Sequence, residues 1–177
     1  GTLNVINGPD LAVEALSIVK KRYPDATLHI YGTNGSDQAR VAALVDKLNL
    51  AGAVIFHGLI TNLGILSQTI SEYTVGLAPY IKRRDSHRAF GDATKLRLYA
   101  GAGLPIITTF VPPLGKELAK FGAAVLTEDS PQDIAAAVMT LFDNKSLYER
   151  LRSRAIAYAK SNTWDRSYGQ ALKIMNV

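Results

Sequence analysis

Residues 92–95, Asp-Ala-Thr-Lys, place a carboxylate, a hydroxyl and an ammonium group at the start of a predicted helix. Asp92 is expected to cap this helix, and Thr94 adds a second polar side chain. A helix N-terminus carries positive partial charge, so Lys95 in the first turn is unfavourable for the helix alone. A lysine at this position makes sense where an anion binds. A solvated Lys95, or a Lys95–Asp92 ion pair, explains the same residues equally well.

Basic side chains are concentrated around this stretch. Such a concentration suits an anionic ligand, for example a phosphate or a carboxylate. The whole chain of 177 residues has a net charge of +5, which a surplus of surface lysine explains better than nucleic-acid binding. No nucleic-acid partner is therefore expected. The residues concerned are Lys82, Arg83, Arg84, His87, Arg88, Lys95 and Arg97.

Several kinds of site are excluded by residue type and spacing. The chain has no cysteine, so disulfides, thiol catalysis and cysteine zinc sites are ruled out. It has no dinucleotide fingerprint, no P-loop and no Gly-x-Ser-x-Gly elbow. His29, His57 and His87 are scattered without metal-ligand spacing, so neither a metal nor a cofactor is expected. His29 suits a structural role in a strand, whereas His57, at a strand end, suits either a structural or a ligand-facing role.

Helical and strand-like patterns alternate along the chain, and this alternation predicts parallel βαβ units. The apolar fraction of 47% is sufficient for a sizeable core. No apolar run approaches the length of a membrane span, and no signal-peptide pattern opens the chain. Strands are expected at residues 26–31, 53–57, 73–78, 104–109 and 123–127. Helices are expected at residues 9–23, 36–48, 62–70, 92–102, 114–121, 131–142, 146–160 and 163–174.

Open parallel sheets bind ligands at the carboxyl ends of their strands. The segments that follow the strands, residues 32–36, 58–63, 79–95 and 108–114, are therefore where a ligand is expected. Thr108 and Thr109 are expected to expose hydroxyl groups at this edge. The glycine-containing turn at residues 32–36 could approach a phosphate, although such turns are more often only connections.

The segment from Lys95 to Thr109, KLRLYAGAGLPIITT, resembles the donor-binding lobe of the retaining GT-B glycosyltransferases. That family typically shows Lys-Leu-x-Glu-Tyr, a small residue, and Gly-x-Pro-Val-Ile-x-Thr. Other segments are similar to the family in the same order, so the resemblance covers nearly the whole chain. These segments are the opening loop with Gly8, residues 24–32 (PDATLHIYG), residues 54–58 (VIFHG), residues 75–80 (VGLAPY) and Trp164-Asp165.

The resemblance implies an α/β fold, with a Rossmann-like parallel sheet and helices on both faces, as one lobe of a GT-B enzyme. Residues 1–177 would form a single nucleotide-sugar-binding domain in the C-terminal part of a longer chain. The implied activity is hexosyl transfer from a nucleoside-diphosphate sugar, expected to be UDP-linked, in polysaccharide biosynthesis. The missing N-terminal lobe would hold an acceptor glycan, lipid or other small molecule. The expected location is the cytoplasm, and any peripheral membrane contact would be made through the missing half.

The resemblance also implies roles for individual residues. Lys95 would be catalytic because it would stabilise negative charge on the leaving diphosphate. The donor would be held without a metal or a cofactor. The implied donor-binding residues are Gly58, Leu59 and Ile60 near the base, Pro79, Tyr80, Arg83 and Asp92 beside the sugar, Thr94 and Lys95 at the phosphates, and Leu98.

The sequence departs from the family pattern at two pairs of positions. Thr2 and Asn7 stand where many members have Arg and Lys, and Phe90 and Leu98 stand where many have the acids of Glu-x7-Glu. The xanthan-type glucuronosyltransferases also lack these acids, and residues 92–99 are similar to their Asp-x-x-Lys-Leu-x-x-Tyr unit.

Two alternatives to a glycosyltransferase stay open. One is a nucleotide-sugar 2-epimerase, for which the acid–base candidates are Asp85, His87 and Asp92. The other is a lobe without donor binding that serves as a scaffold.

Overall fold

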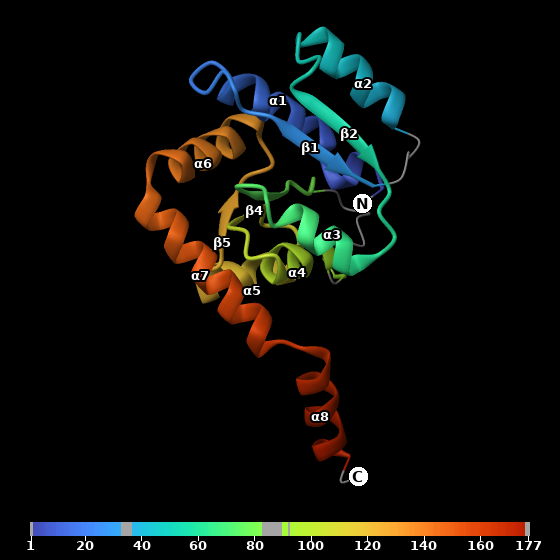
Figure 1. The fold of residues 1–177 in the computed structure, drawn as a ribbon, viewed down its shortest axis with the longest axis vertical. Helices are drawn as coiled ribbons and strands as arrows, with labels where there is room; N and C mark the ends of the chain where they lie inside the picture. The colour runs from blue at the N-terminus through green and yellow to red at the C-terminus, as the bar shows by residue number, and fades with distance from the viewer. Residues whose placement is uncertain (1, 33–36, 83–89, 92, 176–177) are drawn as a thin grey trace.

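The structure is a computed structural model that describes residues 2–32, 37–82, 90–91 and 93–175 (Figure 1). The strands are β1 (Leu28–Tyr31), β2 (Val54–Gly58), β3 (Gly76–Ala78), β4 (Ile106–Thr109) and β5 (Ala124–Thr127). The helices are α1 (Pro9–Val19), α2 (Gln38–Lys47), α3 (Leu63–Ile70), α4 (Thr94–Gly101), α5 (Pro113–Phe121), α6 (Pro131–Asp143), α7 (Lys145–Ser161) and α8 (Trp164–Ile174). A short 3₁₀ helix, Val5–Asn7, precedes α1.

All the described strand pairs are parallel, which confirms the predicted α/β class. The strands form two separate sheets, one with the order β1-β2 and one with the order β3-β4-β5. Leu28 is opposite Val54 in the first sheet, and Ile106 is opposite both Gly76 and Ala124 in the second. Helices flank the strands, and α8 extends away from the body of the domain (Figure 1). No helix among the described residues is both long enough and apolar enough to cross a membrane.

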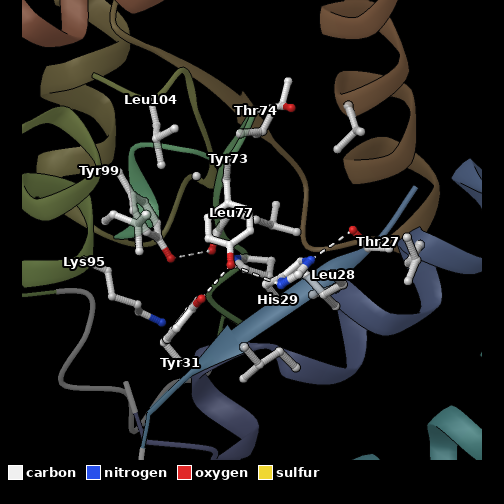
Figure 2. A pocket seen from close by; sticks show the side chains of 18 of the residues that line it. Thr27, Leu28, His29, Tyr31, Tyr73, Thr74, Leu77, Lys95, Tyr99 and Leu104 are labelled. Carbon is white, nitrogen blue, oxygen red and sulfur yellow. Dashed lines mark hydrogen bonds between the residues drawn. The ribbon is translucent and has the colours of Figure 1, made fainter. Parts of the chain in front are cut away.

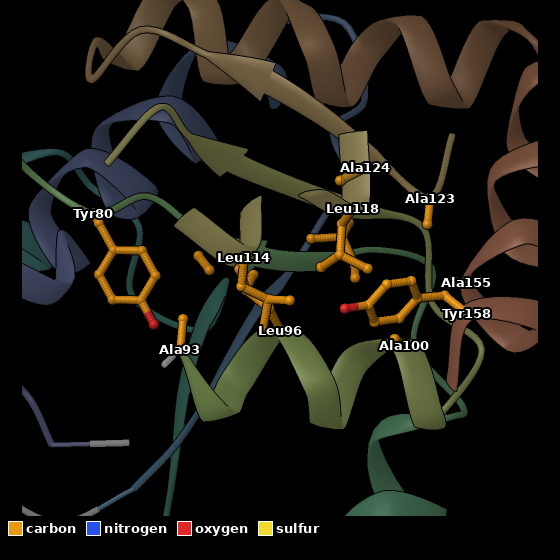
Figure 3. Close-up of a cluster of buried hydrophobic side chains, with 12 residues drawn as sticks. Tyr80, Ala93, Leu96, Ala100, Leu114, Leu118, Ala123, Ala124, Ala155 and Tyr158 are labelled. Carbon is orange, nitrogen blue, oxygen red and sulfur yellow. The ribbon is translucent and has the colours of Figure 1, made fainter. Parts of the chain in front are cut away.

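The three-stranded sheet carries the larger core. Every residue of β4 is buried, as expected for an apolar strand that is covered on both faces. Leu96 of α4 and Leu118 of α5 pack in this core beside Tyr158 of α7 (Figure 3). Their side chains come from different helices, so this core joins α4, α5 and α7 to the sheet.

The two-stranded sheet has a smaller core. Val13 of α1 and Val41 and Val45 of α2 pack there with Val54 of β2. All four residues of β1 are only partly buried. Helix α1 also joins the half of the domain that contains the two-stranded sheet to the half that contains the three-stranded sheet. Its residues Ala15 and Val19 pack with Ile134 and Ala135 of α6.

Helix caps explain several of the observed boundaries. Ser130 Oγ accepts a hydrogen bond from the Asp133 amide at 3.1 Å, which confirms the predicted capping signature of α6. The helix predicted at 92–102 begins instead at Thr94, with Ala93 at the N-cap and no side-chain cap. Asp92, the predicted cap, lies outside the described residues.

The predicted exposure of Thr108 and Thr109 is wrong. Their side chains are buried, and each donates a hydrogen bond to a main-chain carbonyl. Thr108 Oγ1 donates to Ala78 O at 2.8 Å, and Thr109 Oγ1 donates to Tyr80 O at 2.6 Å. The chain leaves β3 at Pro79, so carbonyls in this segment need donors other than a neighbouring strand. The two hydroxyls supply those donors.

Candidate functional site

The opening loop of the chain packs against the segment that follows β3. Gly8 has a φ of 65°, and a Cβ atom there would lie 1.7 Å from the carbonyl oxygen of Pro79. The Ile81 amide donates to Ile6 O at 3.1 Å, which ties the two segments together. Only glycine fits this close backbone approach, because a side chain would meet the Pro79 carbonyl. The loop and the end of β3 therefore form one wall of the site.

Lys95 lies in the first turn of α4, next to this wall. Its Nζ atom is 4.5 Å from the centroid of the Tyr80 ring, and Tyr80 is only 1% exposed. A buried ring that attracts the ammonium group holds a flexible lysine side chain in place. The amide groups at the start of α4 have no side-chain cap among the described residues, so the helix adds positive potential there. The arrangement suits an anion.

A cavity of about 440 Å³ lies beside Lys95. Pro79, Lys95 and Leu98 line it at the end near the opening loop, and residues of β1 and β3 line it further in. Figure 2 shows the Lys95 side chain extending into this cavity on the side of Tyr31. Three of the predicted site residues are therefore brought to one cavity by two segments, the end of β3 and helix α4.

Other predicted site residues lie elsewhere. Gly58 is the last residue of β2, Leu59 and Ile60 follow it, and none of the three lines the cavity. Gly58 has a φ of 74°, and Leu59 is 58% exposed. Thr94 is exposed in the first turn of α4.

Some candidates cannot be placed. Arg83 and Asp92, predicted to bind the donor, lie outside the described residues. Asp85 and His87, which the epimerase alternative needs in addition to Asp92, also lie outside them, so that alternative stays untested.

Asn7 stands at the cavity wall where many family members have a lysine. Its side chain is 8% exposed, and Nδ2 donates to Thr2 O at 2.7 Å. Its Oδ1 atom has no hydrogen-bond partner among the described residues. A buried amide oxygen without a partner is costly, so it indicates that a donor is provided by something else.

The structure also brings together a cluster that the sequence did not reveal. His29 Nδ1 lies 2.8 Å from His57 Nε2 and 3.1 Å from the Tyr73 hydroxyl. The Tyr31 and Tyr73 hydroxyls are 2.5 Å apart, and the Tyr31 ring stacks on His57 at 4.3 Å. His29 and His57 are far apart in the sequence, and the fold brings them together. His29 is opposite Ile55, and His57 follows Ile55 by two residues on the same face of β2, so the alternation of side chains in two adjacent strands is the signal that could have paired them.

The surroundings of this cluster change its proton affinities. Burial, with a smaller effect of the neighbouring His57, lowers the pKa of His29. Burial and the hydrogen bond with Tyr73 raise the pKa of Tyr31 to about 12. The Tyr31 hydroxyl therefore stays protonated at neutral pH. Among the described residues, no group of three His, Asp or Glu side chains is placed to hold a metal ion.

A parallel α/β domain whose strands are flanked by helices is a Rossmann-like fold, and a lysine at a helix N-terminus beside a cavity suits an anionic ligand. Residues 1–144 match the family described as glycosyl transferases group 1, and the chain belongs to this family.

The relatives support the same assignment. The chain is 25% identical to D-inositol 3-phosphate glycosyltransferase of Jonesia denitrificans over 180 residues, which cover 98% of this chain and 41% of that protein. The chain thus spans well under half of this curated relative.

Solved structures share the fold. The C-terminal domain of LpcC, a glycosyl transferase group 1 family protein of Francisella tularensis, has a TM-score of 0.77 at 17% identity and covers 92% of this chain and 82% of that one. HepE of Anabaena, solved in complex with UDP, has a TM-score of 0.81 at 16% identity and covers 100% of this chain and 47% of that one. These neighbours establish a lobe of the GT-B type.

Proposed function

We propose that this chain is the donor-binding lobe of a retaining glycosyltransferase that transfers a hexose from a UDP-sugar. The family supports glycosyl transfer, and a structural neighbour was solved with UDP and glucose. The observation that carries the proposal is the position of Lys95, held over the buried Tyr80 ring at the N-terminus of α4. The acceptor would bind to a second lobe in a longer chain, and the enzyme would act in the cytoplasm on a polysaccharide pathway.

The proposed role of Lys95 is electrostatic stabilisation of the leaving group. When the bond between the sugar and the diphosphate breaks, negative charge grows on the leaving diphosphate oxygen. A fixed ammonium group and the helix N-terminus stabilise that charge without reorganising during the reaction. Lys95 is thus the proposed catalytic residue, and the mechanism uses neither a metal nor a cofactor. The local similarity to the xanthan-type glucuronosyltransferases supports this role, because they keep the lysine without the paired acids.

The remaining contacts follow from the position of the diphosphate at Lys95. Thr94 precedes Lys95 in the chain, and Pro79 and Leu98 line the same cavity as Lys95. These three residues are therefore proposed to contact the phosphates and the sugar. The nucleoside would extend along the carboxyl edge toward Gly58, Leu59 and Ile60. Arg83 and Asp92 remain predicted contacts that the sequence alone supports.

The test is UDP binding measured by calorimetry and by ligand-observed NMR, in this chain and in the complete protein that contains it. Lys95→Ala should weaken binding about 10- to 100-fold, because a charge-assisted hydrogen bond contributes about 1.5–3 kcal/mol. Lys116→Ala is the matched control, since Lys116 is an exposed lysine on the neighbouring helix α5. The affinity of Lys116→Ala for UDP should equal that of the unaltered chain.

Three outcomes would contradict the proposal. Equal binding by Lys95→Ala and the unaltered chain would remove Lys95 from the diphosphate site. Selective binding of GDP or ADP would reject a UDP-linked donor. Failure of the complete protein to bind any of the three nucleotides would favour the scaffold alternative.

A further inference from the structure

Two imidazole rings meet on one face of the two-stranded sheet. His29 lies in β1, and His57 lies two residues beyond Ile55, the β2 residue opposite His29. His29 Nδ1 is 2.8 Å from His57 Nε2. Both side chains are carried by paired strands and point to the same face, so the sheet itself keeps the two nitrogen atoms together. The role proposed for Lys95 uses neither of these nitrogen atoms.

A phenol oxygen lies beside the same histidine nitrogen. Tyr73 belongs to the segment between α3 and β3, and its hydroxyl is 3.1 Å from His29 Nδ1. Figure 2 shows the His29 ring with the hydroxyl groups of Thr27 and Tyr73 on either side. Two nitrogen atoms and one oxygen atom, from three separate segments of the chain, are therefore gathered at one point.

The spacing of these three atoms is close to that of ligands around one metal ion. Zinc–nitrogen bonds are about 2.0–2.1 Å long, so two ligand atoms at bond angles of about 90–110° lie about 2.9–3.4 Å apart. The separations from His29 Nδ1, 2.8 Å to His57 Nε2 and 3.1 Å to the Tyr73 hydroxyl, are near this range. His57 is exposed, so its ring has room to turn its lone pair from His29 toward an ion.

Thr27 supports the far side of the His29 ring. Its Oγ1 atom is 3.1 Å from His29 Nε2. Histidines that bind a metal usually make a hydrogen bond through their other ring nitrogen, and this bond fixes both the tautomer and the orientation of the ring. When Nε2–H donates to Thr27, the Nδ1 lone pair of His29 faces His57 and Tyr73. His29 thus has the supporting contact that a metal-binding histidine needs.

We propose that His29, His57 and Tyr73 form a binding site for zinc or a chemically similar divalent transition-metal ion. Imidazole nitrogen suits zinc, copper and nickel, whereas magnesium and calcium prefer carboxylate and carbonyl oxygen. No three His, Cys, Asp or Glu side chains gather in the part of the chain that the structure describes, so the third protein ligand is the Tyr73 phenol.

Binding of the ion changes the protons of the cluster in a defined way. The two histidines coordinate as neutral imidazoles, with the His29 proton on Nε2 and the His57 proton on Nδ1. Tyr73 releases its proton to solvent and coordinates as the phenolate, and a solvent water completes the coordination. One proton is therefore released for each ion bound. This inference goes beyond the proposed function and does not depend on it.

The experiment is a calorimetric titration with Zn²⁺ of the complete protein that contains this chain and of the chain itself, both without affinity tags. One ion should bind with a dissociation constant of about 10 μM or tighter. Two buffers with different enthalpies of ionisation should report the release of about one proton. His57→Gln should weaken binding at least about tenfold, because it removes a ligand. His57→Cys should retain binding, since a thiolate is also a zinc ligand.

Two conservative variants distinguish coordination from packing. Tyr73→Phe keeps the ring, whose centroid is 4.6 Å from that of His29, and removes only the oxygen atom. It should weaken zinc binding about tenfold and abolish the proton release. Tyr168→Phe, at an exposed tyrosine of α8, is the matched control and should bind zinc like the unaltered protein. Thr27→Val should weaken binding about tenfold while the proton release persists.

Equal zinc binding by His57→Gln and the unaltered protein would overturn the inference. The absence of stoichiometric binding, in samples whose circular dichroism shows the folded protein, would overturn it as well, because the cluster would then be only a hydrogen-bonded contact. UDP binding is measured on the same samples without zinc. A failure of the zinc site and a failure of the donor-binding proposal are therefore observed separately.

Discussion

The two halves of this domain differ in how completely their strands are buried. Strand β4 of the three-stranded half is buried at every residue, whereas every residue of β1 in the two-stranded half is partly exposed. Lys95 and Tyr80 belong to the well-packed half, and the histidine–tyrosine cluster belongs mostly to the other. The candidate anion site is therefore built on the better-packed half, which suits a preorganised electrostatic site.

The sequences of the strands explain this difference. Strand β4 reads Ile-Ile-Thr-Thr, and its threonine hydroxyls donate to carbonyls inside the core. Strand β1 reads Leu-His-Ile-Tyr, so apolar and polar side chains alternate between its two faces. Leu28 and Ile30 pack with the core of α1 and α2, while His29 and Tyr31 form the aromatic cluster. One half has a two-sided core, and the other has a core on one face only.

The largest expected effect tests this contrast in stability. Leu118→Ala, in the core of the three-stranded half, should lower the free energy of unfolding by about 2–5 kcal/mol, because it leaves a cavity around a fully buried side chain. Leu28→Ala, on the partly exposed β1, should cost about 1–2 kcal/mol, since less apolar surface returns to water. Urea unfolding measures both values.

Leu172→Ala on α8 is the control for these two substitutions. Leu172 is 49% exposed, so its loss should change the free energy of unfolding by less than about 0.5 kcal/mol. If Leu28→Ala cost as much as Leu118→Ala, the two halves would be equally well packed, and the comparison would fail.

An intermediate effect is expected at the boundary between the halves. A Cβ atom added at Gly76 would lie 2.6 Å from Cγ of Tyr99, so Gly76→Ala forces the tyrosine ring away from β3. The hydrogen bond from Tyr99 to Leu77 O would be strained or lost with it. Gly76→Ala should therefore lower the free energy of unfolding, measured with urea, by about 1–3 kcal/mol, which is the usual range for overpacking.

Tyr99→Phe separates the two causes of that loss. This substitution keeps the ring against Gly76 and removes only the hydroxyl, so it should lower the free energy of unfolding by about 1 kcal/mol. A Gly76→Ala variant as stable as the unaltered chain would show that Tyr99 moves freely. The cavity side of β3 would then not be held by this contact.

Much of the fold could be predicted from the sequence because its signals are local. Apolar periodicity located the helices and strands, and Ser130 with Asp133 marked the start of α6. The position of Lys95 in the first turn of a helix was also predictable, because the signal for the helix start lies next to it in the chain, and its role toward a diphosphate stays a prediction. Tyr80 was predicted as a direct contact with the sugar. In the structure its ring is buried beneath Lys95.

The features that escaped prediction depend on partners far apart in the chain. His29 and His57 meet only through the register of β1 and β2. Thr108 and Thr109 are buried because β4 is the central strand of its sheet, and their hydroxyls donate to Ala78 O and Tyr80 O, which sequence spacing does not reveal. The division of the sheet is likewise a pairing property, since strand order is not encoded in the periodicity of a single strand.

The smallest expected effect is a pH dependence of the two-stranded half. Burial, with a smaller effect of His57, lowers the pKa of His29 in the folded chain below its ordinary value of 6.5. Above pH 6.5, His29 is neutral in both the folded and the unfolded chain and contributes no pH dependence. Below it, the unfolded chain binds the proton more readily, so the free energy of unfolding falls as the pH falls toward the folded pKa. His29→Asn should flatten this part of the stability profile.

The protonation state of His29 can be measured directly by NMR titration of its imidazole signals. His57→Asn removes the weaker of the two causes, so the pKa of His29 should rise part of the way toward 6.5 and stay below it, because burial persists. Thr27, Tyr31 and Tyr73 surround the pair, and the Tyr31 hydroxyl stays neutral throughout this range. A His29 pKa above 6.5 in the unaltered chain would contradict the packing of this cluster. The two-stranded half would then be more open to water than its contacts indicate.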